Sequence, residues 1–392
     1  MKYKLKDIFD LQMGKTPSRN NSEYWNSEDY KWISIADLSK TGKYISDTKE
    51  YLSESAVEES GIKVIPANTV VMSFKLSIGK TAITAEDMYS NEAIMAFHDK
   101  HVVDVLPEYI FYMFKYRNWD EGSNKAVMGK TLNKATLSEV EIEICPIEEQ
   151  REIVNILDKM MSILNGRENE LSLLDDLIKA RFVEMFGDPQ INPYGWNVVS
   201  ISEVVGGKVS NGFFAKRDDY CDDGNVSVLG VANIVNRMYS KIDELPRTNA
   251  DTKDIEKFEV KYGDMLFCRS SLVAEGIGKA SIIPENVQAN ILFECHVIRL
   301  PLDLSKCVPE FMQTLSTMDF FRNQVIAQSK TATMTTIGQD GILKTDIILP
   351  PIEKQKEFYD FVHQVDKSKV AVQKALDETQ LLFDSLMKKY FG

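Results

Sequence analysis

The stretch PIEEQRE at residues 146–152 decides the fold, because it returns as PIEKQKE at residues 351–357. Residues 146–187 align without a gap to residues 351–392, and both copies end in Phe-Gly. A self-similar segment of this length indicates one structural unit used twice. Weaker similarity extends upstream, so each half is predicted to be a mixed globular part followed by a long helix.

Each repeated tail is predicted to form one helix of about 39 residues, roughly 58 Å long. Proline opens it, acidic residues fill its first turn, and Gly187 or Gly392 closes it. A sustained apolar stride of 3.5 residues predicts a coiled-coil seam rather than a core helix with a wide apolar stripe. Gly166 is expected to weaken the first helix by about 1 kcal/mol relative to alanine. The predicted seam residues are Ile153, Leu157, Met160, Leu164, Leu171, Leu174, Ile178, Met185, Phe358, Val362, Val365, Val372, Leu376, Phe383, Leu386 and Tyr390.

Two copies of one unit can pack with pseudo-two-fold symmetry, which would make the two helices antiparallel. The predicted segments are a globular part over 1–147, a helix over 148–187, a second globular part over 188–351 and a second helix over 352–392. Short β-branched runs and a few helical stretches predict an α+β fold for both globular parts. The strands are expected at 32–36, 63–74, 92–97, 226–231, 264–268 and 292–300, and the helices at 107–116 and 309–327.

The composition is that of an ordinary globular protein, and no apolar run is long enough to cross a bilayer. We therefore expect a cytoplasmic protein that does not engage a membrane. The five cysteines form no CxxC pair, which argues against a zinc knuckle or a disulfide framework. A formal net charge of −13 argues against broad non-specific coating of DNA and leaves local, base-specific reading open.

Polar loops rich in Lys, Arg, Ser, Thr and Asn recur at matching places in the two halves. Such side chains can read base edges or bind phosphates. For any single residue a solvated surface loop is the simpler interpretation, and the recurrence is what favours a DNA surface. The candidate DNA-binding residues are Lys15, Thr16, Ser18, Arg19, Lys75, Lys80, Lys130, Asn133, Lys134, Lys216, Arg217, Arg269, Ser270, Lys279, Lys330, Thr333, Thr335 and Gln339.

No catalytic or metal-binding residue is predicted. The sequences Gly-Lys-Thr at 79–81 and 129–131 resemble the end of a phosphate-binding loop, but Phe74 and Asn124 stand where that loop needs glycine. Asn-Pro-Tyr at 192–194 matches only part of a methyltransferase motif, and the four histidines are scattered along the chain.

The helix openings at 145–150 and 350–355 resemble the "PPLxEQ" opening of type I restriction–modification specificity subunits. The segment from Gly14 to Ser34 resembles the start of a target-recognition domain, and 185–196 resembles the join to a second one. The likeness covers essentially the whole chain. Cys145 replaces the first proline, Lys354 replaces a small or acidic residue, and Asn-Gly-Phe at 211–213 replaces the Gly-x-Thr-Pro of the first half.

The resemblance implies a non-catalytic subunit in which each target-recognition domain reads one half of an asymmetric, bipartite site in double-stranded DNA. The helices would set the spacing between half-sites. Two modification (methyltransferase) subunits and ATP-driven restriction subunits would dock on it. Its acidic helix faces are the expected docking surfaces for the modification subunits. These partners would carry S-adenosylmethionine and ATP, with no cofactor in this chain. The specificity subunit of a type IIB system and a coiled-coil scaffold that does not bind DNA remain alternatives.

Overall fold

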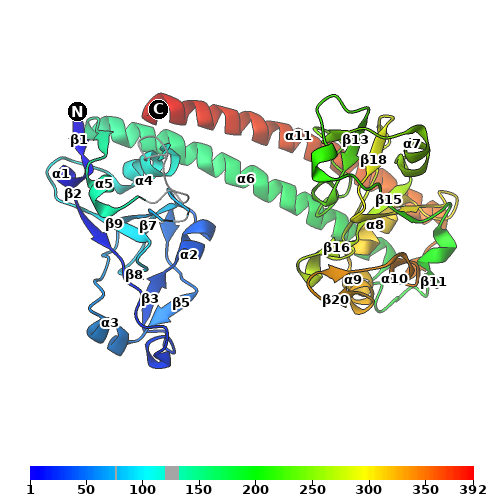
Figure 1. Cartoon of the computed structure of the whole chain (residues 1–392), viewed down its shortest axis with the longest axis horizontal. Coiled ribbons are helices and arrows are strands. Elements are labelled where there is room, and N and C mark those ends of the chain that lie inside the picture. Colours follow the sequence, from blue (N-terminus) through cyan, green and yellow to red (C-terminus); the bar gives the residue numbers. More distant parts are fainter. Residues whose placement is uncertain (76, 120–131) are drawn as a thin grey trace. The chain divides into compact units, whose positions relative to one another are not determined.

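The computed structural model describes residues 1–75, 77–119 and 132–392. The chain divides into two compact units: unit 1 holds residues 1–167 and 375–392, and unit 2 holds residues 168–374. Two 40-residue helices, α6 (Ile147–Phe186) and α11 (Ile352–Phe391), contribute one part to each unit (Figure 1). The segment bounds given above for the globular parts stay a prediction.

Unit 1 is built on a five-stranded sheet in the order β2-β9-β6-β7-β4. A smaller sheet, β5-β3-β8, and a pair, β1-β10, flank it, and α4 packs on the main sheet. The elements are β1 (Lys2–Lys4), α1 (Leu5–Ile8), β2 (Phe9–Met13), η1 (Ser22–Tyr24), β3 (Tyr30–Ile33), α2 (Ile35–Lys40), β4 (Tyr44–Ile45), β5 (Glu50–Leu52), α3 (Glu54–Ser60), β6 (Val70–Ser73), β7 (Thr81–Thr84), β8 (Tyr89–Ser90), β9 (Ile94–Asp99), α4 (Pro107–Tyr116), α5 (Lys134–Ser138) and β10 (Glu141–Glu143).

Unit 2 repeats this plan with a sheet in the order β12-β19-β15-β17, a second sheet β14-β13-β18 and a pair β11-β22. It adds a small ribbon, β16-β21-β20. The elements are β11 (Asn197–Ser200), η2 (Ile201–Val204), β12 (Ser210–Asn211), η3 (Arg217–Asp219), β13 (Val226–Leu229), η4 (Val231–Asn233), β14 (Arg247–Thr248), α7 (Thr252–Phe258), β15 (Asp264–Cys268), β16 (Ser270–Ser271), η5 (Ala274–Gly276), β17 (Ala280–Ile282), β18 (Ile291–Phe293), β19 (Val297–Pro301), α8 (Pro309–Thr317), α9 (Asp319–Ala327), β20 (Lys330–Thr331), β21 (Thr335–Thr336), α10 (Gln339–Leu343) and β22 (Asp346–Leu349).

Strand registers align the two units residue by residue. Val70 pairs with Ile83 in unit 1 as Met265 pairs with Ile282 in unit 2. Tyr44 lies parallel to Ile83, and an isolated parallel bridge joins Tyr239 to Ile282 in the same way. The α+β duplication expected from the sequence is therefore confirmed at the level of hydrogen-bond register.

The helices pair in antiparallel order. In unit 1 the start of α6 shares a core with the end of α11, where Leu157, Leu164 and Phe383 are buried together. In unit 2 the end of α6 shares a core with the start of α11, and the rings of Phe186 and Phe358 lie 5.7 Å apart. All sixteen residues predicted for the seam are buried or half-buried, as a coiled-coil seam requires.

The helix ends depart from the predicted stride. Phe182, Phe186 and Met387 are buried, although a 3.5-residue stride does not select them. The ring of Phe186 packs 4.9 Å from the ring of Phe311 in α8. At this end α6 therefore faces a globular core as well as its partner helix, so its apolar stripe widens toward the 3.6-residue period of an ordinary helix.

Four of the predicted strand ranges need correction. The range 63–74 contains a strand only over Val70–Ser73, which follows a turn with Asn68 at a φ of 61°. The range 226–231 ends as a strand at Leu229, because η4 begins at Val231. The range 32–36 contains a strand only up to Ile33, because Ser34 and Asp37 form a capping box that starts α2. The range 292–300 is two strands, β18 and β19, in different sheets. The helix predicted over 309–327 is also divided, at Met318.

A buried glutamine explains why both helix openings contain the same residue. Gln150 Oε1 accepts from the Leu106 amide at 2.9 Å, and its Nε2 donates to the carbonyls of Asp104 and Cys145, each at 2.9 Å. Gln355 makes the matching bonds to the Val308 amide (2.9 Å) and to the carbonyls of Lys306 (3.2 Å) and Pro350 (2.8 Å). Each glutamine thus ties the start of a long helix to the residue that caps α4 or α8.

Candidate nucleic-acid interface

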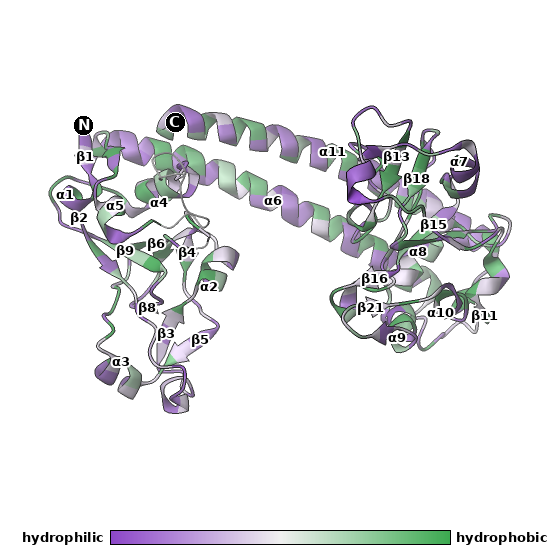
Figure 2. Cartoon of the chain, viewed as in Figure 1, coloured by the Kyte–Doolittle hydropathy of each residue, from purple (hydrophilic) through white to green (hydrophobic). Residues whose placement is uncertain are grey.

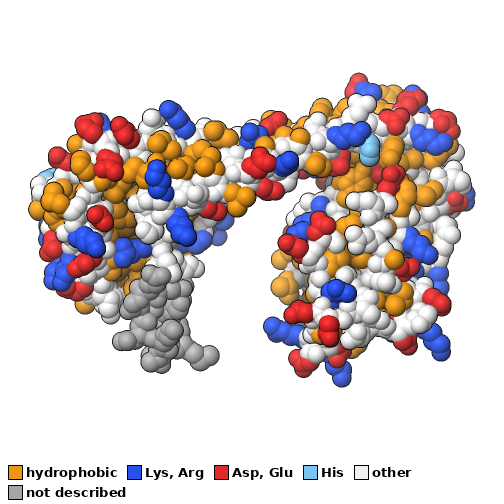
Figure 3. Space-filling view, turned by 90° about the horizontal axis from the view of Figure 1, so that it is seen from above, with side chains coloured by type: hydrophobic (Ala, Val, Ile, Leu, Met, Phe, Trp, Pro, Cys, Tyr) orange, Lys and Arg blue, Asp and Glu red, His pale blue; other side chains and the backbone are white. Residues whose placement is uncertain are grey.

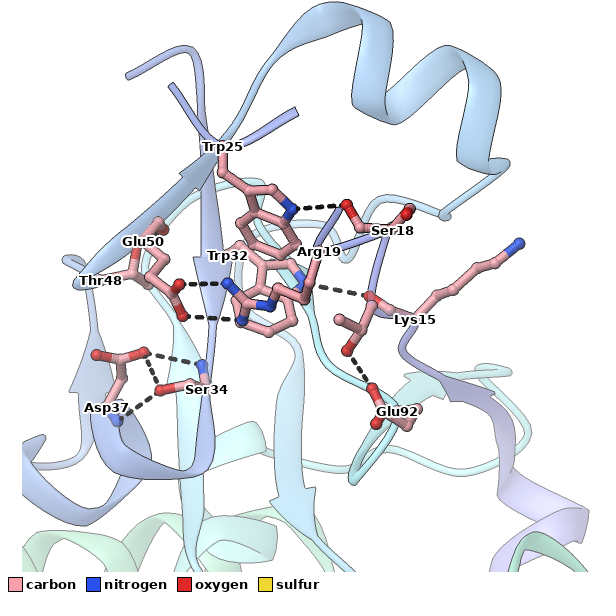
Figure 4. A network of polar contacts seen from close by, with 11 residues as sticks. Lys15, Ser18, Arg19, Trp25, Trp32, Ser34, Asp37, Thr48, Glu50 and Glu92 are labelled. Carbon is pink, nitrogen blue, oxygen red and sulfur yellow. Dashed lines mark hydrogen bonds and ion pairs between the residues drawn. The ribbon is translucent and has the colours of Figure 1, made fainter. Parts of the chain in front are cut away.

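In unit 1 the candidate residues of the β2–β3 loop surround two tryptophans (Figure 4). The Trp32 indole donates to the Lys15 carbonyl at 3.1 Å, and the Trp25 indole donates to the Ser18 carbonyl at 3.1 Å. The guanidinium of Arg19 lies 3.7 Å from the centre of the Trp25 ring and pairs with the carboxylate of Glu50. These contacts hold the loop against β3. The guanidinium of Arg19 is thus bound by Trp25 and Glu50 of its own unit.

Glu92 connects that loop to the β6–β7 loop. The Thr16 hydroxyl donates to its carboxylate, and this bond, with the nearby charges of Lys75 and Arg19, lowers the pKa of Glu92. Lys75 itself lies over the ring of Phe74. Thr16 therefore contacts Glu92 directly, whereas Arg19 and Lys75 act on this carboxylate only through their charge.

The other candidates of unit 1 have different places. Lys80 is exposed at the end of the β6–β7 loop. Asn133 is the N-cap of α5, where its side chain accepts from the Thr136 amide at 2.9 Å, and Lys134 is the exposed first residue of that helix. The cap gives Asn133 a structural role that accounts for its presence. Lys130 lies outside the described residues.

A glycine at the start of the first loop has a counterpart in unit 2. The Gly14 amide donates to Ile94, and the Gly212 amide donates to Val297, at equivalent positions of the main sheet. A Cβ on Gly14 would lie 2.2 Å from the Asn91 carbonyl oxygen, and one on Gly212 would lie 2.2 Å from that of Phe293. Asn-Gly-Phe in the second half therefore supplies the same close backbone contact as Gly-x-Thr-Pro in the first.

In unit 2 three loops that are separate in sequence converge. The ribbon β16-β21-β20 pairs Ser270 with Thr336, and Lys330 with Thr336, so the 268–279 and 328–341 loops lie side by side. The Ile337 amide also donates to the Arg269 carbonyl at 3.0 Å. In the orientation that satisfies its hydrogen bonds, the side-chain oxygen of Gln339 accepts from the Asn211 amide at 3.2 Å. This bond brings the 210–218 loop to the same place as the other two loops.

A cavity of about 480 Å³ opens beside this ribbon. Ser270 and Lys279, both candidates, line it, and so do His296, Glu294 and Asn236, which sequence reasoning missed. The Ser270 hydroxyl lies 2.8 Å from His296 Nδ1, and Lys279 Nζ donates to Asn236 Oδ1 at 2.7 Å. These groups can donate to and accept from base edges. Isolated residues on loops between strands carry no spacing signal that could have revealed them.

Several candidates of unit 2 lie elsewhere. Thr335 is only 2 % exposed and its hydroxyl lies 3.0 Å from that of Thr331, so little of its side chain is accessible to a ligand. Its backbone pairs with Ser271 in the ribbon. Lys216 and Arg217 are exposed at the start of η3, and Lys330 and Thr333 are exposed on the ribbon. Arg269 is half-buried, with its guanidinium donating to the Cys295 carbonyl at 3.3 Å.

The arrangement is suited to recognition. Among residues 1–75, 77–119 and 132–392, no group of three or more His, Cys, Asp or Glu side chains is placed to hold a metal ion. In the same part of the chain, none of the helices is both long and apolar enough to span a membrane. Lys and Arg side chains are interspersed with Asp and Glu on the visible face of each unit (Figure 3), so charge of one sign does not dominate that face.

Comparisons with known proteins agree with this arrangement. Residues 1–173 and 193–379 match the family "Type I restriction modification DNA specificity domain". The chain is 23% identical over 410 residues to the type I restriction enzyme MjaIX specificity subunit of Methanocaldococcus jannaschii, which covers 98% of this chain and 91% of that protein. It is 30% identical over 159 residues to the EcoR124I/EcoR124II specificity subunit of Escherichia coli, 39% of each chain.

The fold also has solved relatives. The S subunit of a type I restriction–modification system from M. genitalium superposes with a TM-score of 0.54 at 12% identity, covering 100% of this chain and 96% of that one. A chain from a study of complex assembly and conformational transition of the type I system gives a TM-score of 0.54 at 17% identity, covering 100% and 97%. Two matching domains on a duplicated fold, each with its own loop surface, establish that the chain belongs to the type I restriction–modification DNA specificity family.

Proposed function

We propose that this chain reads an asymmetric, bipartite DNA site, with one half-site bound by the recognition domain of each unit, and that it performs no chemistry itself. The observation that carries the proposal is that the two units share the strand order of their main sheets but have different side chains in the loops after equivalent strands. At equivalent positions after β6 and β15, unit 1 presents Lys75, whose ammonium lies over the ring of Phe74, and unit 2 presents Ser270, whose hydroxyl lies 2.8 Å from His296 Nδ1. Different side chains on one scaffold read different bases.

Changing one unit at a time tests this assignment. The chain is expressed with its methyltransferase partner, and methylated adenines are mapped across a genome with and without the gene. Ser270→Ala together with His296→Ala should alter the bases accepted in one half-site and leave the other half-site and the spacing unchanged. A change in both half-sites, or a map that does not depend on this gene, would refute the division of labour.

We further propose that two modification subunits dock on α6 and α11, that restriction subunits join them, and that S-adenosylmethionine and ATP are bound by those partners. Hydrophobic residues occur along both helices (Figure 2), and some of them are exposed. Leu173 is 58% exposed and Leu177, four residues further on the same face of α6, is 46% exposed, while Leu381 of α11 is 70% exposed.

Co-purification measures this docking. Leu173→Ser with Leu177→Ser should reduce recovery of the methyltransferase subunit, while Lys179→Ser on the same helix serves as the matched polar control. Equal recovery from all three chains would contradict docking on this face. A neighbouring gene for an ATP-driven restriction subunit would distinguish the type I assembly from a type IIB one.

A further inference from the structure

A second cavity of unit 2, about 330 Å³ in volume, is formed by the last part of α6, the strand β17 and the helices α8 and α9. Its single lining carboxylate, Asp175, is ion-paired at 2.6 Å with Lys369, which does not line it. Positive charge is therefore concentrated here in a chain whose formal net charge is −13. The cationic lining residues are Lys179, Arg237, Lys279 and Arg322.

Arg322 has hydrogen-bonding capacity that the protein leaves unused. Its Nη2 donates to the Glu275 carbonyl at 3.0 Å, whereas its Nη1 is buried and has no hydrogen-bond partner among the residues that the structure describes. Burial lowers the pKa of this guanidinium, and no carboxylate of the described residues offsets that burial. A buried charged donor without a partner is costly, and an anion in the cavity would remove that cost.

Gly278 allows α9, the helix that carries Arg322, to pack closely against the loop before β17. Its φ of 62° lies in the left-handed region. A Cβ there would lie 2.3 Å from Val325 Cγ1 and 3.7 Å from Arg322 Nη1. The glycine of the repeated Ile-Gly-Lys sequence thus lets α9 pack against the loop and sets Arg322 beside Lys279.

Unit 1 concentrates cations at the equivalent place. Lys80 corresponds to Lys279, because each backbone carbonyl accepts from the matching residue, Ser73 or Cys268. Lys115 of α4 corresponds to Thr317 of α8, which lines the cavity. Burial and the nearby charge of Lys80 lower the pKa of Lys115. Both units therefore hold like charges close together at one position of the scaffold.

We infer that the cavity of unit 2 binds one backbone phosphate of DNA next to the half-site that this unit reads, with Arg322 as its anchor. The inference rests on the proposed function. The cavity shares Asn236 and Lys279 with the larger cavity beside the ribbon, so a phosphate here would adjoin the bases read there. Arginine suits this ligand because its fork of donors matches phosphate oxygens. Contacts of this kind position DNA without reading sequence.

The test is DNA binding by the full chain, measured by fluorescence anisotropy over a range of NaCl concentrations. One duplex contains the site found by methylation mapping, and a scrambled duplex of equal length is the reference. Arg322→Gln should weaken binding to both duplexes by a similar factor, roughly 5- to 50-fold, and lower the salt slope by about one. Arg322→Lys should recover part of the loss. Lys253→Gln, an exposed lysine on α7 outside both cavities, should change neither quantity by more than about two-fold.

A neutral methylphosphonate placed at each backbone position in turn identifies the phosphate. At one position the methylphosphonate should weaken DNA binding by the wild-type chain. At the same position it should not weaken binding by Arg322→Gln any further. The double variant Lys179→Gln with Arg237→Gln, both at exposed side chains, should likewise bind DNA more weakly and be insensitive to that methylphosphonate. It tests the phosphate assignment if Arg322→Gln fails to fold. Unchanged binding by these variants, or loss for the mapped site alone, overturns the phosphate assignment. The assignment is also overturned if inorganic phosphate stabilises the wild-type chain while Arg322→Gln binds DNA with normal affinity. A wild-type chain without preference for the mapped site instead refutes the proposed function.

Discussion

Replacing Gln150 with leucine should destabilise unit 1 strongly, since the side chain is fully buried and satisfies three backbone groups. Leucine has a similar volume and no polar atom, so the Leu106 amide and the carbonyls of Asp104 and Cys145 lose their partner. At about 1–2 kcal/mol for each buried group left unpaired, the loss is about 3–6 kcal/mol. The same change at Gln355 should act on unit 2.

Hydrogen exchange locates the effect, and urea denaturation measures it. In Gln150→Leu the amide of Leu106 should lose protection and that of Val308 should keep it, while Gln355→Leu should give the opposite result. Glu149→Ala, at an exposed neighbour on α6, is the control. Gln150→Glu keeps the acceptor and loses both donors at neutral pH, so it should recover partly as the pH falls and the carboxyl can donate once. An unchanged Leu106 amide, or a loss below about 0.5 kcal/mol, would refute this reasoning.

Three further predictions follow from burial and backbone geometry. Gly14→Ala should lower the melting temperature of the chain markedly, because its Cβ would meet the Asn91 carbonyl, whereas Gly42→Ala has open space and should not; equal melting temperatures would contradict the close contact. Gly166→Ala, also in open space, should raise the urea midpoint through a gain of about 1 kcal/mol in helix propensity, and a lowered midpoint would count against a regular helix there. Burial raises the pKa of Glu310 from 4.5 to about 7, so stability from this group is complete below pH 4.5 and is lost as the pH rises through 7. Glu310→Gln should therefore gain up to about 3 kcal/mol at pH 8 and little at pH 4, and a gain independent of pH would exclude the carboxyl as its cause.

The repeated helices were the most predictable part of the fold. Their period, opening proline and closing glycine act over a long stretch, and α6 and α11 begin and end within one residue of the expected bounds. The helix over 107–116 was equally accessible, since Pro107 marks its first residue. These signals lie within the helical segments themselves, so no knowledge of distant contacts is needed to find them.

The ribbon of unit 2 and the cavity that Arg322 lines could not be predicted in the same way. Strands β16, β20 and β21 have two residues each and consist of Ser, Thr and Lys, without an alternation of apolar and polar residues. The cavity that contains Arg322 draws on α6, β17, α8 and α9, which no spacing rule connects. Only the pairing of distant segments brings these residues together, and pairing of this kind leaves no periodic trace in the sequence.

The two units agree in the contacts that tie their helices to the sheet and differ in their loops. The bond from Tyr44 to Glu108, 2.6 Å long, is repeated from Tyr239 to Glu310 at 3.2 Å, and the glutamine contacts are repeated group for group. The Trp-supported loop around Arg19 has no such copy among the described residues of unit 2, where a Ser, Thr and Lys ribbon is added. A substitution in the repeated set should therefore cost stability, whereas one in an unrepeated loop should change the DNA site and leave stability nearly intact. That separation is what one scaffold carrying two unlike reading surfaces requires.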